Sequence, residues 1–278
     1  MDKKDKIFSA KNFLKGFKRK LQTYPKTKYY EKLKRLIADE SQIGKLFPES
    51  EVSEHYGDKG MRNNIFHPDL FINQIRYFRI YEYFKHNYPE MFDNSIRVLN
   101  AGDSSGLLLK AMERRGDSVN INPHSVARIK DKGINVYRAN IYNLPFDDNS
   151  YDYVLAFQCL EHLESPLAGL KELIRVAKKK IFISVPYQRA TKVYNKRYWD
   201  SLICLPEHEG GWGVGEVDRD CDYHIFELST SDFINMVSYT SFKCTKNFPI
   251  NYLSSLGKYK NNHGSYFNFF ELEPKKSS

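Results

Sequence analysis

The sequence predicts an α/β fold, with a Rossmann-like, mostly parallel sheet and helices on both faces. Three observations predict it. Strand-like and helix-like runs alternate between residues 97 and 185. A loop holding Gly102 and Gly106 follows the first strand-like run, and an asparagine recurs every 20 residues where the first three such runs end. Regular alternation of this kind is typical of parallel sheets, whose strands are joined by crossover helices.

The individual elements can be placed in order along the chain. Pro123 suits the first turn of a helix, because the N–H that proline lacks would have no partner there. Strands are predicted at 97–100, 118–121, 135–139, 153–157 and 180–185, and the helices between them at 106–115, 123–132 and 166–178.

After Pro186 the alternation stops. Residues 187–228 are rich in Tyr, Trp, Gly and charged residues, and we expect an insertion there that covers the acceptor side of the domain. A late helix is predicted to start at Ser229 or Thr230, since both residue types cap helices well. Strands at 241–250 and 266–272 follow it.

The domain organisation follows from these elements. We expect residues 1–92 to form a basic, helical N-terminal extension and residues 93–275 to form the α/β domain. The stronger helices of the extension are predicted at 29–38 and 72–87, and Pro89 marks the end of the second.

The first 35 residues carry the whole positive charge. They hold 13 lysines and arginines against three acids, a surplus of ten, while the chain totals +9, so the remainder is nearly neutral. Apolar residues recur there at near-helical spacing, which predicts an amphipathic helix. It could contact an anionic membrane surface or RNA, or pack on the domain. These apolar residues are Ile7, Phe13, Leu14, Phe17 and Leu21.

Composition excludes several classes of protein. The four cysteines include no Cys-x-x-Cys, and no apolar run is long enough to span a bilayer or to form a signal peptide. We therefore expect a cytoplasmic protein, with peripheral membrane contact as the alternative. The stretch "GDSSG" does not indicate a serine protease in a chain of this α/β pattern. Two glycines alone do not supply the nicotinamide-cofactor fingerprint.

The ends of the predicted strands carry the most information about function. Ligands of doubly wound sheets bind at the carboxyl ends of the strands, and Asn100, Asn120 and Asn140 are placed there. A cofactor ribose needs hydrogen-bonding groups about one strand–helix unit after the glycine loop, which is where Asn120 stands. Three asparagines at three matching strand ends indicate one binding crevice.

Residues 96–187 resemble the class I S-adenosylmethionine (SAM) dependent methyltransferases, most closely the small-molecule group. The resemblance rests on "VLNAGDSSG", "VNINP" and the long run "ANIYNLPFDDNSYDYVLAFQCLEHLESPLAGLKELIRVAKKKIFISVP". "YHIFELSTSDF", from Tyr223, also resembles the segment before the family's late helix. The first 90 residues show no such likeness. The resemblance implies SAM as cofactor.

The resemblance also implies a role for each residue of the crevice. The glycine loop would cradle the methionine part of SAM, with Asn100 near its amino group. Asn120 would meet the ribose and Ile121 the adenine face. The remaining cofactor-binding residues implied are Gly102, Asp103, Ser104 and Gly106 in the loop, Asn140 and Ile141 at the adenine edge, and Gln158 near the sulfonium.

Methyl transfer to oxygen or nitrogen can require a base, and histidine is the usual one near neutral pH. His162 and His224 are the candidates. The acceptor is expected to be a small molecule, a glycan or a lipid-linked precursor. Its pocket is expected to use residues of the insertion, namely Tyr187, Arg189, Tyr198, Trp212 and Tyr223.

Two metal sites are conceivable from the sequence, and neither is expected. Some quinone-pathway and RNA-end methyltransferases bind a divalent ion through Glu-x-x-Glu-His after the fourth strand, but here Gln158 replaces the first glutamate. A hard cation loses much of its attraction with that carboxylate. A zinc site is the alternative, although its spacing is not that of a standard zinc module. It would use Cys204, His208, Cys221 and His224.

The chain departs from the family at four positions. Asn100, Asn120 and Asn140 stand where the family usually has acids, and Ser104 stands where it usually has glycine. Two alternatives therefore stay open: a catalytically degenerate methyltransferase fold that serves as a binding or scaffold protein, and an RNA methyltransferase guided by the basic leader. The oligomeric state is not assigned.

Overall fold

The structure is a computed structural model that describes residues 41–53, 68–114, 116–188, 190–193, 224–251 and 265–276. The basic leader (residues 1–35) and the predicted helix over 29–38 lie outside these residues. No described helix combines the length and the apolar character that crossing a bilayer requires.

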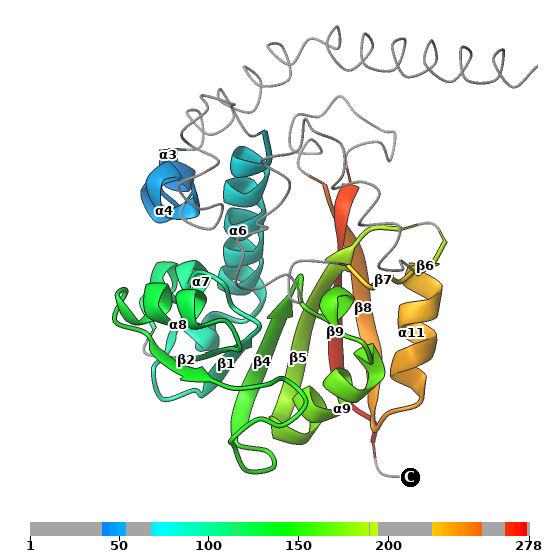
Figure 1. The fold of residues 1–278 in the computed structure, drawn as a ribbon. Helices are drawn as coiled ribbons and strands as arrows, with labels where there is room; N and C mark the ends of the chain where they lie inside the picture. Colours follow the sequence, from blue (N-terminus) through cyan, green and yellow to red (C-terminus); the bar gives the residue numbers. More distant parts are fainter. Residues whose placement is uncertain are drawn as a thin grey trace, which may run out of the picture.

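A seven-stranded sheet forms the centre of the described structure (Figure 1). Its strands are β1 (Val98–Ala101), β2 (Asp117–Asn120), β3 (Asn135–Arg138), β4 (Tyr151–Phe157), β5 (Ala177–Pro186), β8 (Phe242–Asn251) and β9 (Ser265–Pro274). They lie in the order β3-β2-β1-β4-β5-β9-β8, and β1 to β5 run parallel. β9 runs antiparallel to both of its neighbours, β5 and β8. The predicted mostly parallel α/β sheet is confirmed.

The helices begin where the sequence offers a cap. Asn122 caps α8 by accepting from the N–H groups of His124 and Ser125, and Ser229 caps α11 by accepting from Asp232 N–H. The described helices are α3 (Ser41–Leu46), α4 (Glu49–Ser53), α6 (Pro68–Asn87), η2 (Pro89–Phe92), α7 (Leu107–Ala111), α8 (Pro123–Lys130), η3 (Leu160–His162), α9 (Pro166–Val176) and α11 (Thr230–Ser238). β6 (Lys192–Val193) and β7 (Phe226–Glu227) form a separate, short antiparallel pair.

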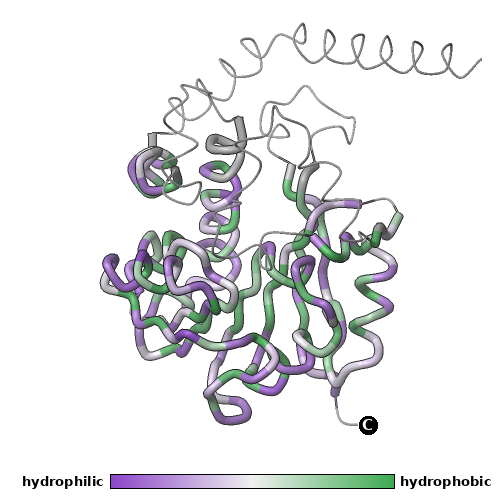
Figure 2. The backbone as a smooth tube through the Cα atoms, viewed as in Figure 1, coloured by the Kyte–Doolittle hydropathy of each residue, from purple (hydrophilic) through white to green (hydrophobic). Residues whose placement is uncertain are grey.

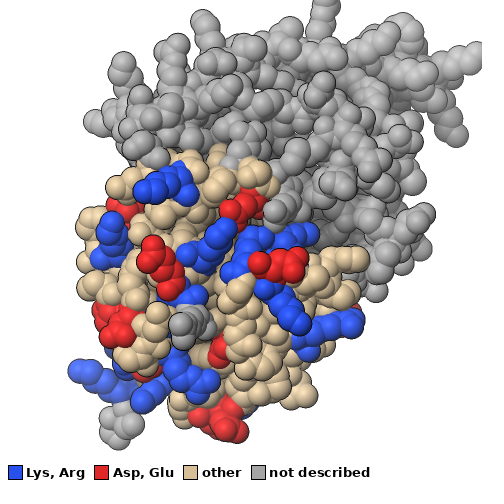
Figure 3. Space-filling view, turned by 90° about the vertical axis from the view of Figure 1, so that its left-hand side faces the viewer, with Lys and Arg blue, Asp and Glu red and all other residues tan. Residues whose placement is uncertain are grey.

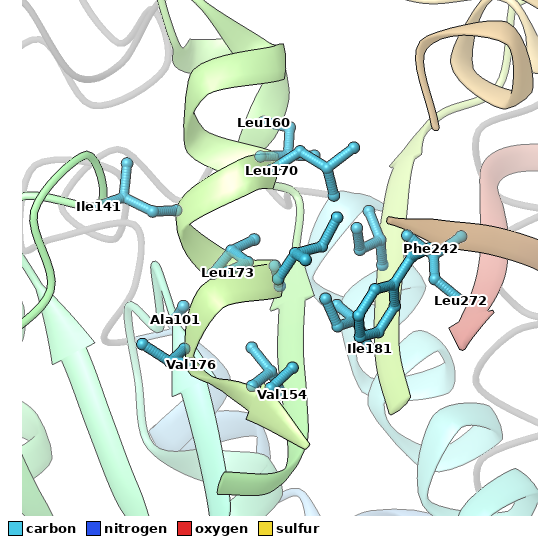
Figure 4. Packing of buried hydrophobic residues seen from close by; sticks show 14 of the residues in the cluster. Ala101, Ile141, Val154, Leu160, Leu170, Leu173, Val176, Ile181, Phe242 and Leu272 are labelled. Carbon is cyan, nitrogen blue, oxygen red and sulfur yellow. The ribbon is translucent and has the colours of Figure 1, made fainter. Parts of the chain in front are cut away.

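The sheet separates two hydrophobic cores. Successive residues of a strand point to opposite faces, so Val98 belongs to one core and Leu99 to the other. Helices α6, α7 and α8 complete the first core, and α9 and α11 complete the second (Figure 1). In the second core, Leu170 and Leu173 of α9 face the strands (Figure 4). Hydrophobic residues follow the central strands, as a sheet covered on both faces requires (Figure 2).

Helix α6, from the predicted extension, shares the first core with the sheet. The ring of Phe84 is fully buried, with its centroid 4.9 Å from that of Phe182 on β5. Tyr88, just after α6, lies equally close to Phe182. Residues 74–92 are therefore packed into the α/β core along one face of the sheet.

Three predicted helices are shorter in the structure, and the one predicted over 123–132 covers Pro123–Lys130. The helix predicted over 106–115 covers Leu107–Ala111, because Gly106 and Glu113 adopt left-handed backbone conformations at φ 72° and 53°. The helix predicted over 166–178 ends at Val176, and β5 starts at the next residue. Ala177 lies opposite Tyr151 in the β4–β5 ladder, so sheet pairing overrides the helical pattern of this lysine-rich stretch.

Candidate functional site

The carboxyl ends of the parallel strands gather the predicted cofactor residues. Asn100 lies within β1, directly opposite Ser118 of β2 and Leu155 of β4. Asn120 is the last residue of β2, and Asn140 follows the end of β3 by two residues. The structure thus places all three asparagines at one edge of the sheet.

The glycine loop between β1 and α7 requires both of its glycines. Gly102 has φ 72°, and a Cβ there would lie 2.4 Å from Cys159 Sγ. Gly106 also has φ 72°, and a Cβ there would lie 2.8 Å from Cδ1 of Ile134. Any other residue would be strained in these conformations, and at 102 it would also clash with Cys159, whereas the end of the Ile134 side chain can move away from a residue at 106. The loop is therefore pressed closely against the segment that follows β4.

The carboxylate of Asp103 holds the loop together from within. Its Oδ1 accepts from the N–H groups of Ser105 and Gly106, at 3.0 and 2.9 Å, and its Oδ2 accepts from Ser118 Oγ at 2.9 Å. Asp103 is only 8% exposed. This side chain serves the loop and neighbouring β2.

The side chain of Asn120 is also engaged with the loop. Its Nδ2 donates to the backbone oxygen of Asp103 at 2.6 Å, and its Oδ1 accepts from Asn122 N–H at 2.8 Å. An amide carries two N–H donors and a carbonyl with two lone pairs, so one donor and one lone pair are left over from these bonds. Asn120 therefore links β2 to the glycine loop through its donor group.

The two isoleucines of the site differ in exposure. Ile121 is 46% exposed, whereas Ile141 is 8% exposed and belongs to the core on the α9 face. Asn140, next to Ile141, is exposed and accepts from Tyr142 N–H at 3.0 Å. Of the two isoleucines, only Ile121 presents a large apolar side chain at this edge of the sheet.

Helices α6 and α8 border the glycine loop. Tyr77 Oη on α6 lies 3.3 Å from Ser105 Oγ, a contact that joins the N-terminal part to the loop. On the other side, Arg128 of α8 donates to the backbone oxygen of Ser104 at 2.9 Å. The sequence carries no local signal for either contact, since each joins residues more than 20 positions apart.

Gln158 occupies a sharp turn directly after β4. It has φ 54°, a left-handed conformation that is uncommon for a residue with a side chain. Its N–H donates to Ser184 O at 2.9 Å, and its Nε2 donates to Ser184 Oγ at 3.2 Å. The neighbouring strand β5 therefore fixes this turn.

Four ionisable side chains, Glu161, His162, His224 and Glu227, assemble beyond this turn, and we call them the Glu/His cluster. The rings of His162 and His224 lie with centroids 4.9 Å apart. Nδ1 of His224 lies 2.7 Å from Glu227 Oε1. Ile225 N–H donates to Glu161 O at 2.7 Å, which joins the two contributing segments.

Glu161 is the most deeply buried member of the cluster. Its side chain is 2% exposed, and neither carboxylate oxygen accepts a hydrogen bond from any described residue. Burial raises the pKa of Glu161 to about 7, against the attraction of His224, of the Glu161 backbone N–H, which lies outside hydrogen-bonding geometry, and of Arg76. Burial alone would lower the pKa of His224, but the hydrogen bond to Glu227 and the charge of Glu161 raise it above its ordinary value. The cluster thus sets two carboxylates, that of Glu161 buried, beside two partly buried imidazoles.

The sequence of residues 99–183 matches the protein family described as "Methyltransferase domain". Over these residues the chain is similar to methyltransferase domains. The strand order and the packed helices are those of the class I SAM-dependent methyltransferase fold.

Individual relatives match over limited stretches. An uncharacterized methyltransferase of Schizosaccharomyces pombe is 54% identical over 39 residues, 14% of each chain. A chloroplastic 2-methyl-6-phytyl-1,4-hydroquinone methyltransferase of Oryza sativa subsp. japonica is 23% identical over 96 residues, 31% of this chain and 28% of its own length. The matched stretches thus span less than a third of these curated relatives.

A solved structure shows the same fold over a longer range. Magnesium protoporphyrin IX methyltransferase from Synechocystis PCC 6803, determined with bound SAM, superposes with a TM-score of 0.52 at 13% identity. The match covers 81% of this chain and 90% of that one. At this identity the likeness concerns the fold.

Part of the predicted acceptor pocket of the methyltransferase domain is described. Tyr187 is half-buried and directly follows β5. Arg189, Tyr198, Trp212 and Tyr223 lie outside the described residues, as do Cys204, His208 and Cys221 of the zinc alternative. The structure brings His162 and His224 together, and it adds Glu161 and Glu227, which the sequence analysis did not assign to the acceptor site.

Proposed function

We propose that the chain is a SAM-dependent methyltransferase that acts on an oxygen or nitrogen of a small molecule, a glycan or a lipid-linked precursor. The carrying observation is the contact between Gly102 and Cys159. It joins the glycine loop to the turn that leads to Glu161, two residues after Cys159. A cofactor held by the loop would therefore lie beside the Glu/His cluster.

The residues at the strand ends offer the apolar and the polar groups that SAM binding requires. Ile121 offers an exposed apolar surface for the adenine ring, next to the predicted ribose contact Asn120. The second N–H and second lone pair of the Asn120 amide suit a ribose hydroxyl, which both donates and accepts. Asn100 and Gln158 stand on either side of the loop, where the methionine part is expected.

The chemistry requires orientation more than activation. SAM, when bound, supplies a methyl group that its sulfonium has already activated. The protein then has to hold the acceptor in line and to accept a proton where the acceptor is a hydroxyl or a protonated amine. With Nδ1 of His224 donating to Glu227, Nε2 is the atom that would take this proton. His162 is the second candidate base.

The relatives support a small-molecule acceptor. The matched proteins carry the names of a protoporphyrin methyltransferase and a hydroquinone methyltransferase. The proposed acceptor pocket would combine Tyr187 with the insertion residues Arg189, Tyr198, Trp212 and Tyr223.

The alternative of a degenerate methyltransferase fold has one supporting observation. Asn120 uses one N–H donor and one lone pair in hydrogen bonds within the chain. It therefore has fewer groups free to bind a ribose than a carboxylate without such bonds would have. A fold that no longer binds SAM would serve to bind a partner instead. The outcome of a cofactor titration separates the two functions.

The RNA alternative has little support from the described surface. On the face shown in Figure 3, Lys and Arg alternate with Asp and Glu over the described residues. Extended RNA contact needs a basic tract, which in this sequence is confined to residues 1–35. Salt-dependent RNA binding, measured with and without that leader, tests this alternative.

The first experiment is calorimetric titration of the folded, full-length chain with SAM and with its demethylated product. We expect binding in the micromolar range. Ile121→Asp should weaken it at least about tenfold, since it puts a charge against the adenine ring. Tyr239→Asp, at another exposed large hydrophobic residue (71% exposed), is the matched control and should leave it unchanged.

Either result of the titration is informative. Absence of binding up to millimolar SAM, in protein with a cooperative unfolding transition, would contradict the enzyme function and favour the degenerate fold. With binding established, labelled SAM offered with small-molecule, glycan, lipid and RNA fractions identifies the acceptor class.

A further inference from the structure

We infer that Glu161, His162 and His224 form a binding site for a divalent transition-metal ion, with Zn²⁺ and Co²⁺ as suitable probes and Mg²⁺ as a poor one. One ligand atom from each of the three residues lies within 4.8 Å of the others. Ligand atoms bound to one ion at about 2.1 Å are at most about 4.2 Å apart, so small side-chain rotations close the set.

The buried carboxylate of Glu161 is the first argument. A carboxylate that is 2% exposed and accepts no hydrogen bond within the described part of the chain is costly to ionise. A cation bound between Glu161 and the two imidazoles would supply the missing partner. The carboxylate oxygens of Glu161, which are buried and lack hydrogen bonds, are also the atoms that would bind the ion.

The hydrogen bond of His224 is the second argument. Imidazoles that bind metals usually donate their other ring N–H to a carboxylate, which fixes the ring and its tautomer. His224 Nδ1 is 2.7 Å from Glu227 Oε1, and Glu227 Oε2 accepts from Gln188 Nε2 at 2.5 Å. Nε2 of His224 is then the ligand atom, held by a chain of two hydrogen bonds.

The choice of metal follows from the donor set. Two imidazoles with one carboxylate suit zinc and other first-row ions, whereas Mg²⁺ and Ca²⁺ prefer oxygen ligands. The local charge also permits a cation. When ionised, Glu161 and Glu227 carry two negative charges, the nearby Arg76 carries one positive charge, and neutral histidines add none. A divalent ion leaves a net charge of about plus one.

The metal would have a use in methyl transfer, and this part rests on the proposed function. Three protein ligands leave a tetrahedral ion one open position, which an acceptor hydroxyl can fill. Coordination lowers the pKa of that hydroxyl, and its proton leaves to solvent. The oxygen lone pair then forms the new bond to the methyl carbon while the carbon–sulfur bond breaks, giving a neutral thioether. His162 and His224 would thus act as ligands in place of a base.

The test is metal titration of the chelator-stripped, full-length chain by calorimetry, with Co²⁺ absorption as a second readout. We expect one Zn²⁺ or Co²⁺ per chain at micromolar concentration or below. Mg²⁺ should bind at least about 100-fold more weakly. Glu161→Gln and His224→Gln should each lower the affinity at least about 100-fold, and Glu227→Gln about 10–100-fold. His124→Gln, at an exposed histidine of α8, is the control and should change nothing.

Cobalt spectra separate this site from the cysteine alternative. A Glu/His site gives Co²⁺ ligand-field bands without a thiolate charge-transfer band. A thiolate band that Cys204→Ser or Cys221→Ser removes, with Glu161→Gln harmless, would overturn the inference. So would the absence of binding at millimolar metal. SAM titration of Glu161→Gln keeps the two proposals apart, because cofactor binding should survive in that variant.

Discussion

Gly102 and Cys159 meet so closely at the edge of the sheet that a single methyl group on the glycine would overlap the cysteine sulfur. The distance from a Cβ at 102 to Cys159 Sγ would be 2.4 Å. This contact joins the loop after β1 to the turn after β4, and thereby the proposed cofactor site to the Glu/His cluster.

Gly102→Ala should therefore destabilise the protein in two ways. The left-handed backbone costs alanine about 1 kcal/mol, and the clash with Cys159 adds to it, for a total of about 2–4 kcal/mol. Urea unfolding measures the loss, and SAM affinity should fall with it. Gly133→Ala is the matched control, with φ 74° but nothing within 4 Å of the added carbon. It should lose only the backbone part, about 1 kcal/mol. Equal losses in the two variants would show that the contact with Cys159 does not affect the free energy of unfolding.

Asn120→Asp should weaken the site, although an acid is usual there in the resembling family. Aspartate cannot donate to the backbone oxygen of Asp103, which Asn120 Nδ2 reaches at 2.6 Å. We expect a loss of about 1–3 kcal/mol in stability at neutral pH, measured by thermal unfolding. Asn140→Asp is the control, because the hydrogen bond from Tyr142 N–H uses Oδ1 of Asn140 as an acceptor, a role that aspartate keeps. A gain in SAM affinity for Asn120→Asp without loss of stability would contradict this prediction.

Arg114→Met should destabilise the fold by about 3 kcal/mol. The buried guanidinium donates to the backbone oxygens of Met91, Asp93 and Ile96, just before β1. Methionine fills the space of the stem but leaves these carbonyls without their charged donor. Lys130→Met, at an exposed position of α8, should stay within about 0.5 kcal/mol of the parent in urea unfolding.

Glu271 should make stability fall as pH rises towards neutral. Burial and the nearby Glu273 raise the pKa of Glu271 from 4.5 to about 7 in the folded protein. The unfolded chain therefore gives up its proton first, and stability decreases between about pH 4.5 and pH 7.

Glu271→Gln should remove this decrease, on the order of 1–3 kcal/mol, and keep an acceptor for Tyr88 Oη, which is 2.7 Å from Glu271 Oε2. Melting temperatures from pH 5 to pH 8 check it. Glu273→Gln is the comparison on the same strand. The hydrogen bond from Lys180 is the main cause that lowers the pKa of Glu273. Glu273→Gln should therefore lower the stability above about pH 4.5 and leave it unchanged in acid. A parallel pH profile for Glu271→Gln and the parent would contradict the assignment.

Local patterns predicted most of the fold. Gly102, Pro123 and Ser229 mark a turn and two helix starts through backbone chemistry that each residue carries by itself. Alternating strands and helices then allow few topologies. The start of β5 at Ala177 could not be predicted this way, because the pairing of Ala177 with Tyr151 decides it and the local sequence favours a helix.

The site was predictable only in part, for the same reason. The positions of Asn100, Asn120 and Asn140 follow from the strand ends, but the bond from Asn120 to Asp103 depends on how the loop folds back. The Glu/His cluster joins residues from either side of the insertion. Sequence patterns indicate His162 and His224 separately, and their contact arises only where β7 approaches η3.

The position of β9 has a consequence for how the protein is made. β9 lies between β5 and β8 and pairs with both, yet the ribosome produces it after either of them. Until then, β5 and β8 each expose an unpaired edge, the kind of surface on which nascent chains aggregate. The sheet therefore closes only after β9 has been made, and changes in β9 should reduce the yield of soluble protein before they affect any property of the finished site.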